Sequence, residues 1–335
     1  MQKKLIALAV AGLMAAPVMA QSNVTIYGIV DIGIQHGSSS TVSGAKSRTG
    51  LDSGLDNGSR IGFRGTEDLG NGLKAGFVLE QGFNVDTGAP DSSLQFHRQA
   101  FVSLSGGFGT VALGRQYTPQ HSMLSRLDPF GIRNGAGSAA GGDRWMHDSR
   151  LDNTIAYVSP NMNGFNVVVA HSLNAGGQEV QKDAGNAKVW AVSPRYTNGP
   201  LDVQLNYHRI KSDASGATAT KVWDLGGAYD FGAVKLAAVY GTRKASNIVD
   251  KRSWLLGATV PVSDAGAVKL SYVHSKEREA DNTSKQWALG YQHNLSSRTY
   301  LYTNFARRSG DLTAADYRMD VPYRNRFDLG VRHAF

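Results

Sequence analysis

The sequence predicts an all-β fold, a sixteen-stranded antiparallel transmembrane β-barrel, and three observations predict it. Apolar and polar residues alternate with a period of two in segment after segment. Short turns alternate with longer polar connections along the chain. Beyond the N-terminal residues, no stretch reaches roughly 18 consecutive apolar residues, the length expected of a membrane-spanning helix. Strands are therefore the elements that remain for crossing a membrane.

The alternation is clearest in residues 201–208, 286–295 and 326–335. Residues 201–208 read L-D-V-Q-L-N-Y-H, so that apolar and aromatic side chains share one parity and polar side chains share the other. Successive side chains of a strand point to opposite faces, so this pattern predicts strands with one apolar face. Charged residues such as Lys235, Arg243 and Lys269 on the other parity favour a water-filled bore over the packed core of a soluble sandwich.

The connections between the predicted strands fall into two groups of different length. The short turns are expected at residues 68–72, 106–109, 160–164, 198–200, 231–233, 263–266 and 294–297. The longer loops are expected around residues 37–58, 86–92, 117–149, 174–186, 212–219, 245–250, 279–284 and 309–322. Seven short turns and eight long loops require sixteen strands that run alternately up and down. Short turns at one rim and long loops at the other are typical of an outer-membrane barrel.

The first twenty residues read as an export signal that is cleaved from the mature chain. Lys3 and Lys4 form a positive end, an apolar run of about 12 residues follows, and Val18-Met19-Ala20 supplies small residues before a cleavage site. That run is too short to span a bilayer. We therefore expect residues 1–20 to be a cleaved signal peptide and residues 21–335 to form a single barrel domain.

Composition excludes several classes of function. The chain has no cysteine, which removes disulfides, thiol catalysis and thiolate metal sites together. Its 39 glycines, 13 tyrosines and 12 phenylalanines suit many strands joined by tight turns. A net charge of +8 is spread along the chain without a dense Lys/Arg run, so no nucleic-acid partner is expected. The nine histidines show no metal-binding spacing, and we expect neither a metal nor a cofactor.

Residues 59–83, which read SRIGFRGTEDLGNGLKAGFVLEQGF, resemble the general porins of Gram-negative outer membranes. They look closest to the branch of Neisseria-like and other betaproteobacterial species. The similarity continues at residues 101–116, 152–171 and 330–335, and covers essentially the whole mature chain. The resemblance implies a barrel of sixteen strands whose third long extracellular loop folds into the lumen.

The resemblance also implies partners and a function. Porins of this type assemble as homotrimers, contact outer-membrane lipid and lipopolysaccharide, and end in an aromatic residue, here Phe335, that the barrel-assembly machinery reads. They form a water-filled channel in the cell outer membrane for passive diffusion of small hydrophilic solutes and ions. The alternative is a substrate-selective outer-membrane channel for small anionic solutes or sugars.

The loop at residues 117–149 supports an inward fold independently of the resemblance. Its roughly 33 residues carry no strand pattern, and a connection of that length is normally functional or disordered. It contains apolar residues able to anchor it to a wall, namely Leu124, Leu127, Phe130, Trp145 and Met146. Its Asp128-Pro129-Phe130-Gly131 resembles the acidic segment at the tip of porin constriction loops, with the order of acid and proline reversed.

A diffusion pore carries out no bond chemistry, so its functional residues set the width and the electric field. By resemblance, the basic wall of the pore constriction falls on Arg60, Arg98 and Arg150. Parity agrees for the first two, since Arg60 is out of phase with its apolar neighbours and Arg98 with Phe101. Glu80 and Asp128 are the expected acidic side. Because guanidinium stays charged when crowded, such a cluster predicts a weak preference for anions.

Two further hypotheses compete with the channel. An outer-membrane enzyme would need an activated serine or paired acids, and the adjacent letters His147-Asp148-Ser149 cannot converge on one proton path. A soluble exported β-protein, such as a lectin-like module, would leave the membrane without detergent. We therefore expect a channel and not an enzyme.

Overall fold

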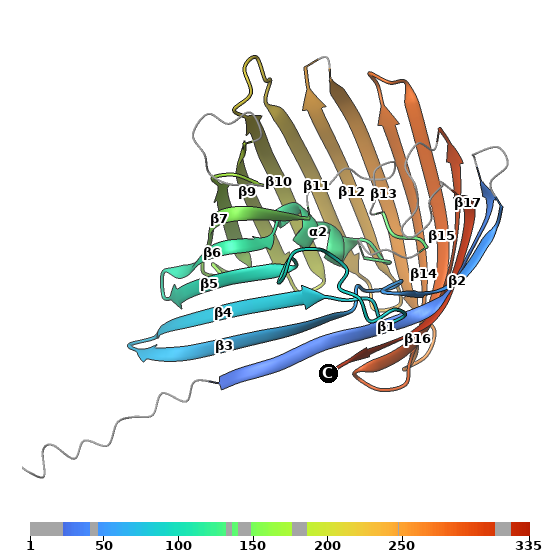
Figure 1. Cartoon of the computed structure of the whole chain (residues 1–335), viewed down its shortest axis with the longest axis horizontal. Coiled ribbons are helices and arrows are strands. Elements are labelled where there is room, and N and C mark those ends of the chain that lie inside the picture. The colour runs from blue at the N-terminus through green and yellow to red at the C-terminus, as the bar shows by residue number, and fades with distance from the viewer. Residues whose placement is uncertain are drawn as a thin grey trace, which may run out of the picture.

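The computed structural model describes residues 23–40, 46–131, 136–139, 149–175, 186–246, 248–311 and 323–335. The predicted signal peptide, residues 1–20, lies outside these ranges, as do Trp145 and Met146 of the long loop. Seventeen strand segments and one short helix are present in the described residues (Figure 1).

The strands form one antiparallel sheet in which chain neighbours are also sheet neighbours. Their bounds are β1 Asn23–Ser40, β2 Arg48–Ser53, β3 Arg60–Gly70, β4 Leu73–Gly82, β5 Gln99–Gly106, β6 Gly109–Tyr117, β7 Arg150–Val158, β8 Phe165–Ser172, β9 Ala187–Asn198, β10 Leu201–Ser212, β11 Thr220–Asp230, β12 Lys235–Ala245, β13 Val249–Pro261, β14 Gly266–Glu277, β15 Asn282–Asn294, β16 Thr299–Gly310 and β17 Tyr323–Ala334.

The sheet closes because β1 pairs with β17, with Ile29 opposite Ala334 and Ser40 opposite Tyr323. On its other edge β1 pairs with β2 through residues 32–37 and with β3 through residues 23–29. The segments β2 and β3 thus occupy one position in the barrel, and the predicted sixteen-stranded antiparallel barrel is confirmed. Closure leaves no unpaired edge, which is the condition for a sheet in lipid.

Alternate residues of each strand face the two sides of the wall, as the sequence predicts. On β11, Trp223 and Leu225 are exposed on the outer surface, whereas Val222 and Asp224 point inward and are buried. Inward positions on other strands carry polar side chains that are almost fully buried, for example Gln35, Asn206 and Asp328. The outer surface is therefore apolar and the bore polar, the reverse of a soluble protein.

The seven predicted short turns all lie between strands of the barrel, at one rim. In the β3–β4 turn, Asn71 and Gly72 both have positive φ, 52° and 77°. A tight hairpin needs such a conformation, because its twist then matches the twist of the strands. The strand ends that the long connections join lie at the opposite rim, so the predicted asymmetry of the barrel is present.

In the structure, much of the region predicted as a long loop, residues 37–58, forms strands. Residues 37–40 continue β1, residues 48–53 form β2, and only residues 54–59 leave the sheet in the later part of this region. There Leu55 is fully buried beside Tyr300 and Tyr302 of β16. Small and polar residues dominate this region without a clear alternation, so the sequence pattern alone did not reveal the pairing of β2 with β1.

Helix α2, Pro119–Leu127, lies in the long connection between β6 and β7. The Thr118 side chain caps it by accepting a hydrogen bond from the backbone N–H of His121 at 3.0 Å, and Pro119 occupies its first turn. Figure 1 shows the helix on the concave side of the sheet, and its contacts are with β9 to β12. No described helix is long and apolar enough to cross a membrane.

Candidate functional site: an arginine-lined cavity beside helix α2

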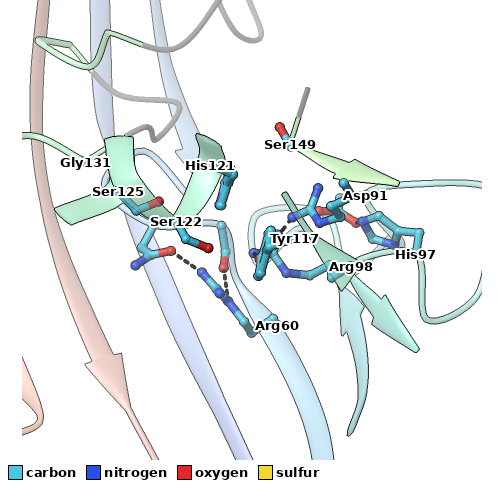
Figure 2. A pocket seen from close by; sticks show the side chains of 13 residues that line it. Arg60, Asp91, His97, Arg98, Tyr117, His121, Ser122, Ser125, Gly131 and Ser149 are labelled. Carbon is cyan, nitrogen blue, oxygen red and sulfur yellow. Dashed lines mark hydrogen bonds and ion pairs between the residues drawn. The ribbon is translucent and has the colours of Figure 1, made fainter. Parts of the chain in front are cut away.

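A cavity of about 490 Å³ lies between the wall formed by the early strands and the helix α2 (Figure 2). Its lining residues come from the segment before β3, the β4–β5 connection, the end of β6, the α2 region and the start of β7. They are Asn57, Gly58, Arg60, Asp91, His97, Arg98, Tyr117, His121, Ser122, Ser125, Gly131, Ser149 and Arg150. Three of the lining residues are thus the arginines that the sequence singled out.

Arg60 begins β3 and is held from two sides. Its Nε donates to the carbonyl oxygen of Gly58 at 2.9 Å, and its terminal nitrogen donates to the Asn57 side-chain oxygen. A second terminal nitrogen lies 3.7 Å from a carboxylate oxygen of Glu80 on the neighbouring strand β4. Ile61, the next residue, is exposed on the outer surface. The strand period therefore sends the guanidinium of Arg60 into the bore.

Arg98 precedes β5 and forms the tightest ion pair of the cluster. Its Nε donates to Glu80 Oε1 at 2.8 Å, and only 8% of Arg98 and 3% of Glu80 is exposed to solvent. The other oxygen of Glu80 accepts from the Tyr27 hydroxyl at 3.0 Å. Glu80 therefore serves Arg60, Arg98 and Tyr27 together, and stays behind the arginines and outside the set that lines the cavity.

Tyr117, the last residue of β6, joins the other two arginines. Its hydroxyl oxygen accepts from Arg98 at 3.0 Å and from Arg150 at 3.2 Å. The Arg150 guanidinium also lies over the Tyr117 ring, 4.7 Å from its centroid. His121 of α2 stacks on the same ring, with centroids 4.2 Å apart. One tyrosine thus fixes two guanidiniums and the first turn of the helix.

His97 and Asp91 add a weaker pair at the edge of the cavity, in the β4–β5 connection. His97 Nε2 lies 2.9 Å from an Asp91 carboxylate oxygen. Burial lowers the pKa of His97 below its usual value; Asp91 opposes this, and the nearby charges of Arg150, Arg98 and Arg115 reinforce it. His97 is therefore neutral at neutral pH, and the permanent positive charge of the site comes from the arginines.

The helix side of the cavity carries hydroxyl groups instead of carboxylates. Ser122 and Ser125 face the arginines there, together with His121 and Gly131 (Figure 2). Asp128 lies elsewhere. It is 3% exposed, and its oxygens accept from the backbone N–H of Phe130 at 3.0 Å and of Ala139 at 2.8 Å. Asp128 thus secures the fold of its own loop and does not line the cavity.

Polar contacts fix α2 against inward residues of the later strands. Gln120 donates to Asp224 of β11 at 2.7 Å, and the guanidinium of Arg126 lies 3.2 Å from Asp202 of β10. Below them, the buried side chains of the helix form an apolar cluster with the wall. Its members are Met123, Leu124, Leu127, Ala139, Ala228, Ala237, Val239, Leu255 and Val273.

Three glycines on alternate strands make room for the segment that follows. A Cβ at Gly226 of β11 would lie 2.6 Å from Leu127, and one at Gly257 of β13 would lie 2.5 Å from Pro129. A Cβ at Gly290 of β15 would lie 2.6 Å from the ring of Phe130. Such separations are too short for any real side chain. These glycines form a shallow track along which residues 127–130 pack closely against the barrel wall.

Four of the predicted site residues, Arg60, Arg98, Arg150 and Glu80, are thus brought together, and Asp128 is separate from them. Phe335 lies at the seam of the barrel, where its backbone exchanges two hydrogen bonds with Gly28, each of 3.1 Å.

Sequence reasoning missed Tyr117, Asn57 and His97. Nothing in the strand pattern marks them, because each lies at the end of a strand or in a connection, where parity carries no information.

A closed barrel with an apolar outer surface and a polar, arginine-lined bore defines a membrane channel. Residues 7–313 match the family of Gram-negative porins. The chain is 35% identical to the outer membrane porin protein 32 of Delftia acidovorans over the full length of both chains. It is 28% identical to the major outer membrane protein P.IB of Neisseria gonorrhoeae, covering 89% of this chain and 91% of that one.

Solved structures agree. The anion-selective porin from Comamonas acidovorans superposes with a TM-score of 0.83 at 33% identity, covering 94% of this chain and 100% of that one. A trimer form of OmpT from Vibrio cholerae shares the fold, with a TM-score of 0.69 at 16% identity over 94% of this chain and 99% of that one.

This chain belongs to the Gram-negative porin family. It is a porin of the Gram-negative outer membrane, a water-filled channel for passive diffusion of small hydrophilic solutes and ions. The family and its relatives are channels rather than enzymes. Among the residues that the structure describes, no group of three or more His, Asp or Glu side chains could hold a metal ion.

Proposed function

We propose that this porin is weakly anion-selective, and that its constriction lies between the arginine cluster and the loop that contains α2. The observation that carries the proposal is the charge balance of the cavity. Arg60, Arg98 and Arg150 all line it. Two carboxylates lie near them, Glu80, which is paired with Arg98 and Arg60, and Asp91, which lies beside the neutral His97. Three guanidiniums against two carboxylates leave one net positive charge.

The opposite side of the cavity strengthens this balance. A carboxylate at the loop tip would set up a field across the bore, which orders water and admits both signs of ion. The described residues on that side offer hydroxyl, imidazole and backbone groups and no carboxylate, and Asp128 is turned into its own loop. The potential in the cavity is therefore positive, which raises the local concentration of anions. The selectivity in the name of the Comamonas acidovorans porin, 33% identical, supports the same sign.

The packing of α2 supports the narrowing role of its loop. The helix rests on inward residues of β10 and β11, and residues 127–130 run along the glycine track. These contacts hold the loop across from the arginines. The width of the channel is then set by the separation between the arginine cluster and the described part of this loop.

Reversal potentials of the purified protein in planar bilayers under a potassium chloride gradient test the proposal. The wild type should show a potential of the sign that favours chloride. Arg60→Gln combined with Arg150→Gln should move it towards or past zero, because two of three fixed charges are removed. Arg64→Gln is the matched control, since it removes a charge from the same strand outside the cavity. A wild-type potential that favours potassium would contradict the proposal.

The outer surface supports a homotrimer whose protein interface uses the early strands. The outward positions of β1, β3, β4 and β5 carry no Lys or Arg, and several are large, exposed and apolar: Val24, Ile26, Ile34, Ile61, Val102 and Leu104. The one acidic residue at these positions, Glu67, lies near the short-turn rim, and the rest of the face is suited to burial against other copies of the chain. We also propose that residues 1–20 are removed on export, which leaves the barrel of residues 21–335.

The later strands present a different outer surface, which supports contact with lipopolysaccharide. At the long-loop end of β9, β11, β13 and β15, a cation precedes an outward tryptophan by two residues. These pairs are Lys188 and Trp190, Lys221 and Trp223, Arg252 and Trp254, and Lys285 and Trp287. Tryptophan sits at the membrane interface. The cations beyond it therefore lie at the level of the phosphate-bearing headgroups.

The sheet register places one of these cations, Lys221, directly opposite cations of both neighbouring strands. Arg209 faces Lys221, and Lys221 also faces Lys244 on the next strand. Like charges in such positions destabilise a sheet unless an anion lies between them. Arg209 and Lys221 form no ion pair with a described acidic residue. We propose that phosphate groups of lipopolysaccharide supply the missing negative charge.

A further inference from the structure

A second cavity, of about 210 Å³, lies between α2 and the inner wall of β7, β8 and β9. It shares Tyr117 and Ser122 with the arginine-lined cavity. The two cavities are therefore neighbours, and a solute at the arginine cluster has only to pass Tyr117 to enter the second one. We call it the side cavity.

Part of the wall of the side cavity is apolar, which is unusual for a water-filled bore, although Thr154, Asn166, Ser193 and Gln204 also line the cavity. Ala156 and Val158 of β7 lie opposite Ala170 and Val168 of β8, all four at inward positions, and together they line the cavity. The apolar inward residues of β12 to β14 are covered by α2. Val158 and Val168 instead stay partly exposed and border open space.

The mouth of the side cavity carries positive charge. Arg126 of α2 and Arg195 of β9 both contact the carboxylate of Asp202, at 3.2 Å for Arg126 and at 2.8 and 2.9 Å for Arg195. One carboxylate balances only one of the two guanidiniums. Each arginine side chain is 31% exposed, so both keep donors available to a solute.

We infer that the side cavity is a transient binding site for small monocarboxylates that bear a short hydrocarbon tail. The carboxylate pairs with Arg126 and Arg195 at the mouth, and the tail lies against Val158 and Val168. The volume equals that of about seven liquid waters, which limits the tail to a few carbons. The inference rests on the proposed anion-selective pore and adds a preference that charge alone does not give.

Chain length separates this site from simple attraction of anions. Charge alone binds acetate and hexanoate equally, and simple diffusion slows as the solute grows. Contact with the apolar wall instead increases affinity by up to about fourfold for each fully buried methylene. The half-blocking concentration, at which the solute halves the chloride current, should therefore fall along the series acetate, butanoate, hexanoate.

Single-channel recording in symmetric chloride, with each acid added in turn, tests the inference. For the wild type, we expect a saturable reduction of the current, with the half-blocking concentration falling two- to fourfold per methylene. Val158→Thr with Val168→Thr keeps the shape of the wall but makes it polar, and should abolish this dependence on chain length. Arg126→Gln should raise the half-blocking concentration of all three acids. Arg332→Gln, which removes an inward charge outside the side cavity, should leave the series unchanged.

The outcomes separate this inference from the proposed function. Equal blocking by acetate and hexanoate, or the same chain-length dependence in the double threonine variant, overturns the side cavity as a binding site. In either case a chloride-favouring reversal potential leaves the anion-selective pore standing. A potassium-favouring potential in the wild type instead overturns the proposed function. Hexanol, which has the tail without the charge, should not block the wild type, and blocking by hexanol at equal concentration also counts against the inference.

Discussion

The Nε of Arg98 lies 2.8 Å from a carboxylate oxygen of Glu80, and this pair is nearly sealed from solvent at the start of β5. Removing one partner of such a pair leaves the other charge buried and unbalanced. Glu80 also contacts Arg60 and Tyr27, so it holds together the wall of the arginine-lined cavity.

Glu80→Gln should increase the preference for anions, because it removes the negative charge closest to the three arginines. The amide keeps the shape and some of the hydrogen bonds, and we expect a loss of about 1–3 kcal/mol in the free energy of unfolding. Reversal potentials and thermal unfolding in detergent measure the two effects. Glu67→Gln removes the same charge near the short-turn rim of β3 and should change neither by much. An unchanged reversal potential for Glu80→Gln would show that this charge does not act on the permeating ions.

Gly257→Val should displace the loop from the wall, because a Cβ at this position already overlaps Pro129. Single-channel conductance should rise or become heterogeneous once residues 127–130 no longer pack against the barrel wall. Gly227→Val is the matched control, since it adds the same side chain on the outer side of β11, where the nearest atom lies 3.4 Å from the Cβ position. Identical conductance histograms for both variants would contradict the close packing at Gly257.

Gly28→Val should impair closure of the barrel although it leaves Phe335 intact. The Phe335 ring occupies the space of a Cβ at Gly28, with the nearest ring atom 2.3 Å away. We expect a smaller folded fraction on heat-modifiable gels, as for Phe335→Ala. The comparison separates two roles of Phe335. If Gly28→Val folds normally while Phe335→Ala fails, recognition by the assembly machinery accounts for the aromatic residue, and its packing at the seam does not.

The anion preference should stay constant from alkaline pH down to the usual pKa of histidine and rise only at lower pH. Because burial lowers the pKa of His97, its imidazole is still neutral at the usual pKa of histidine and becomes protonated only at lower pH. His97→Asn removes the group, and reversal potentials across pH should then lose the part of the rise that it causes. A rise centred at or above the usual histidine pKa would mean that His97 is not held neutral by its surroundings.

Lys221→Gln combined with Arg209→Gln should weaken association with lipopolysaccharide, because these cations face each other across β10 and β11. Copurified lipopolysaccharide, measured per barrel after detergent washing, should fall, and added salt should reproduce part of the loss. Lys235→Gln, at the short-turn rim, is the control. If the double variant kept all of its lipopolysaccharide, the surface around Arg209 and Lys221 would be ruled out as the binding surface.

Much of the fold could be predicted from the sequence, because the parity of a strand is a local property. Leu205 and Asn206 take opposite faces whatever the neighbouring strands are, so alternation gives the apolar outside, the polar bore and the positions of the turns. The inward direction of Arg60 follows in the same way. Parity agreed for Arg98 as well, but the grouping of Arg60, Arg98 and Arg150 in one cluster rested on the resemblance, because parity relates residues of one strand and not residues of three strands.

A period of two and turn chemistry were enough to predict a closed barrel of sixteen strands and the residue types in its bore. Three features became visible only in the folded chain: Tyr117 joins Arg98 to Arg150, Asp128 turns into its own loop, and glycines of β11, β13 and β15 form a track for residues 127–130. Except for the contacts of Asp128 within its loop, these contacts join residues far apart in the chain. They depend on the path of the loop through space, which no local pattern records.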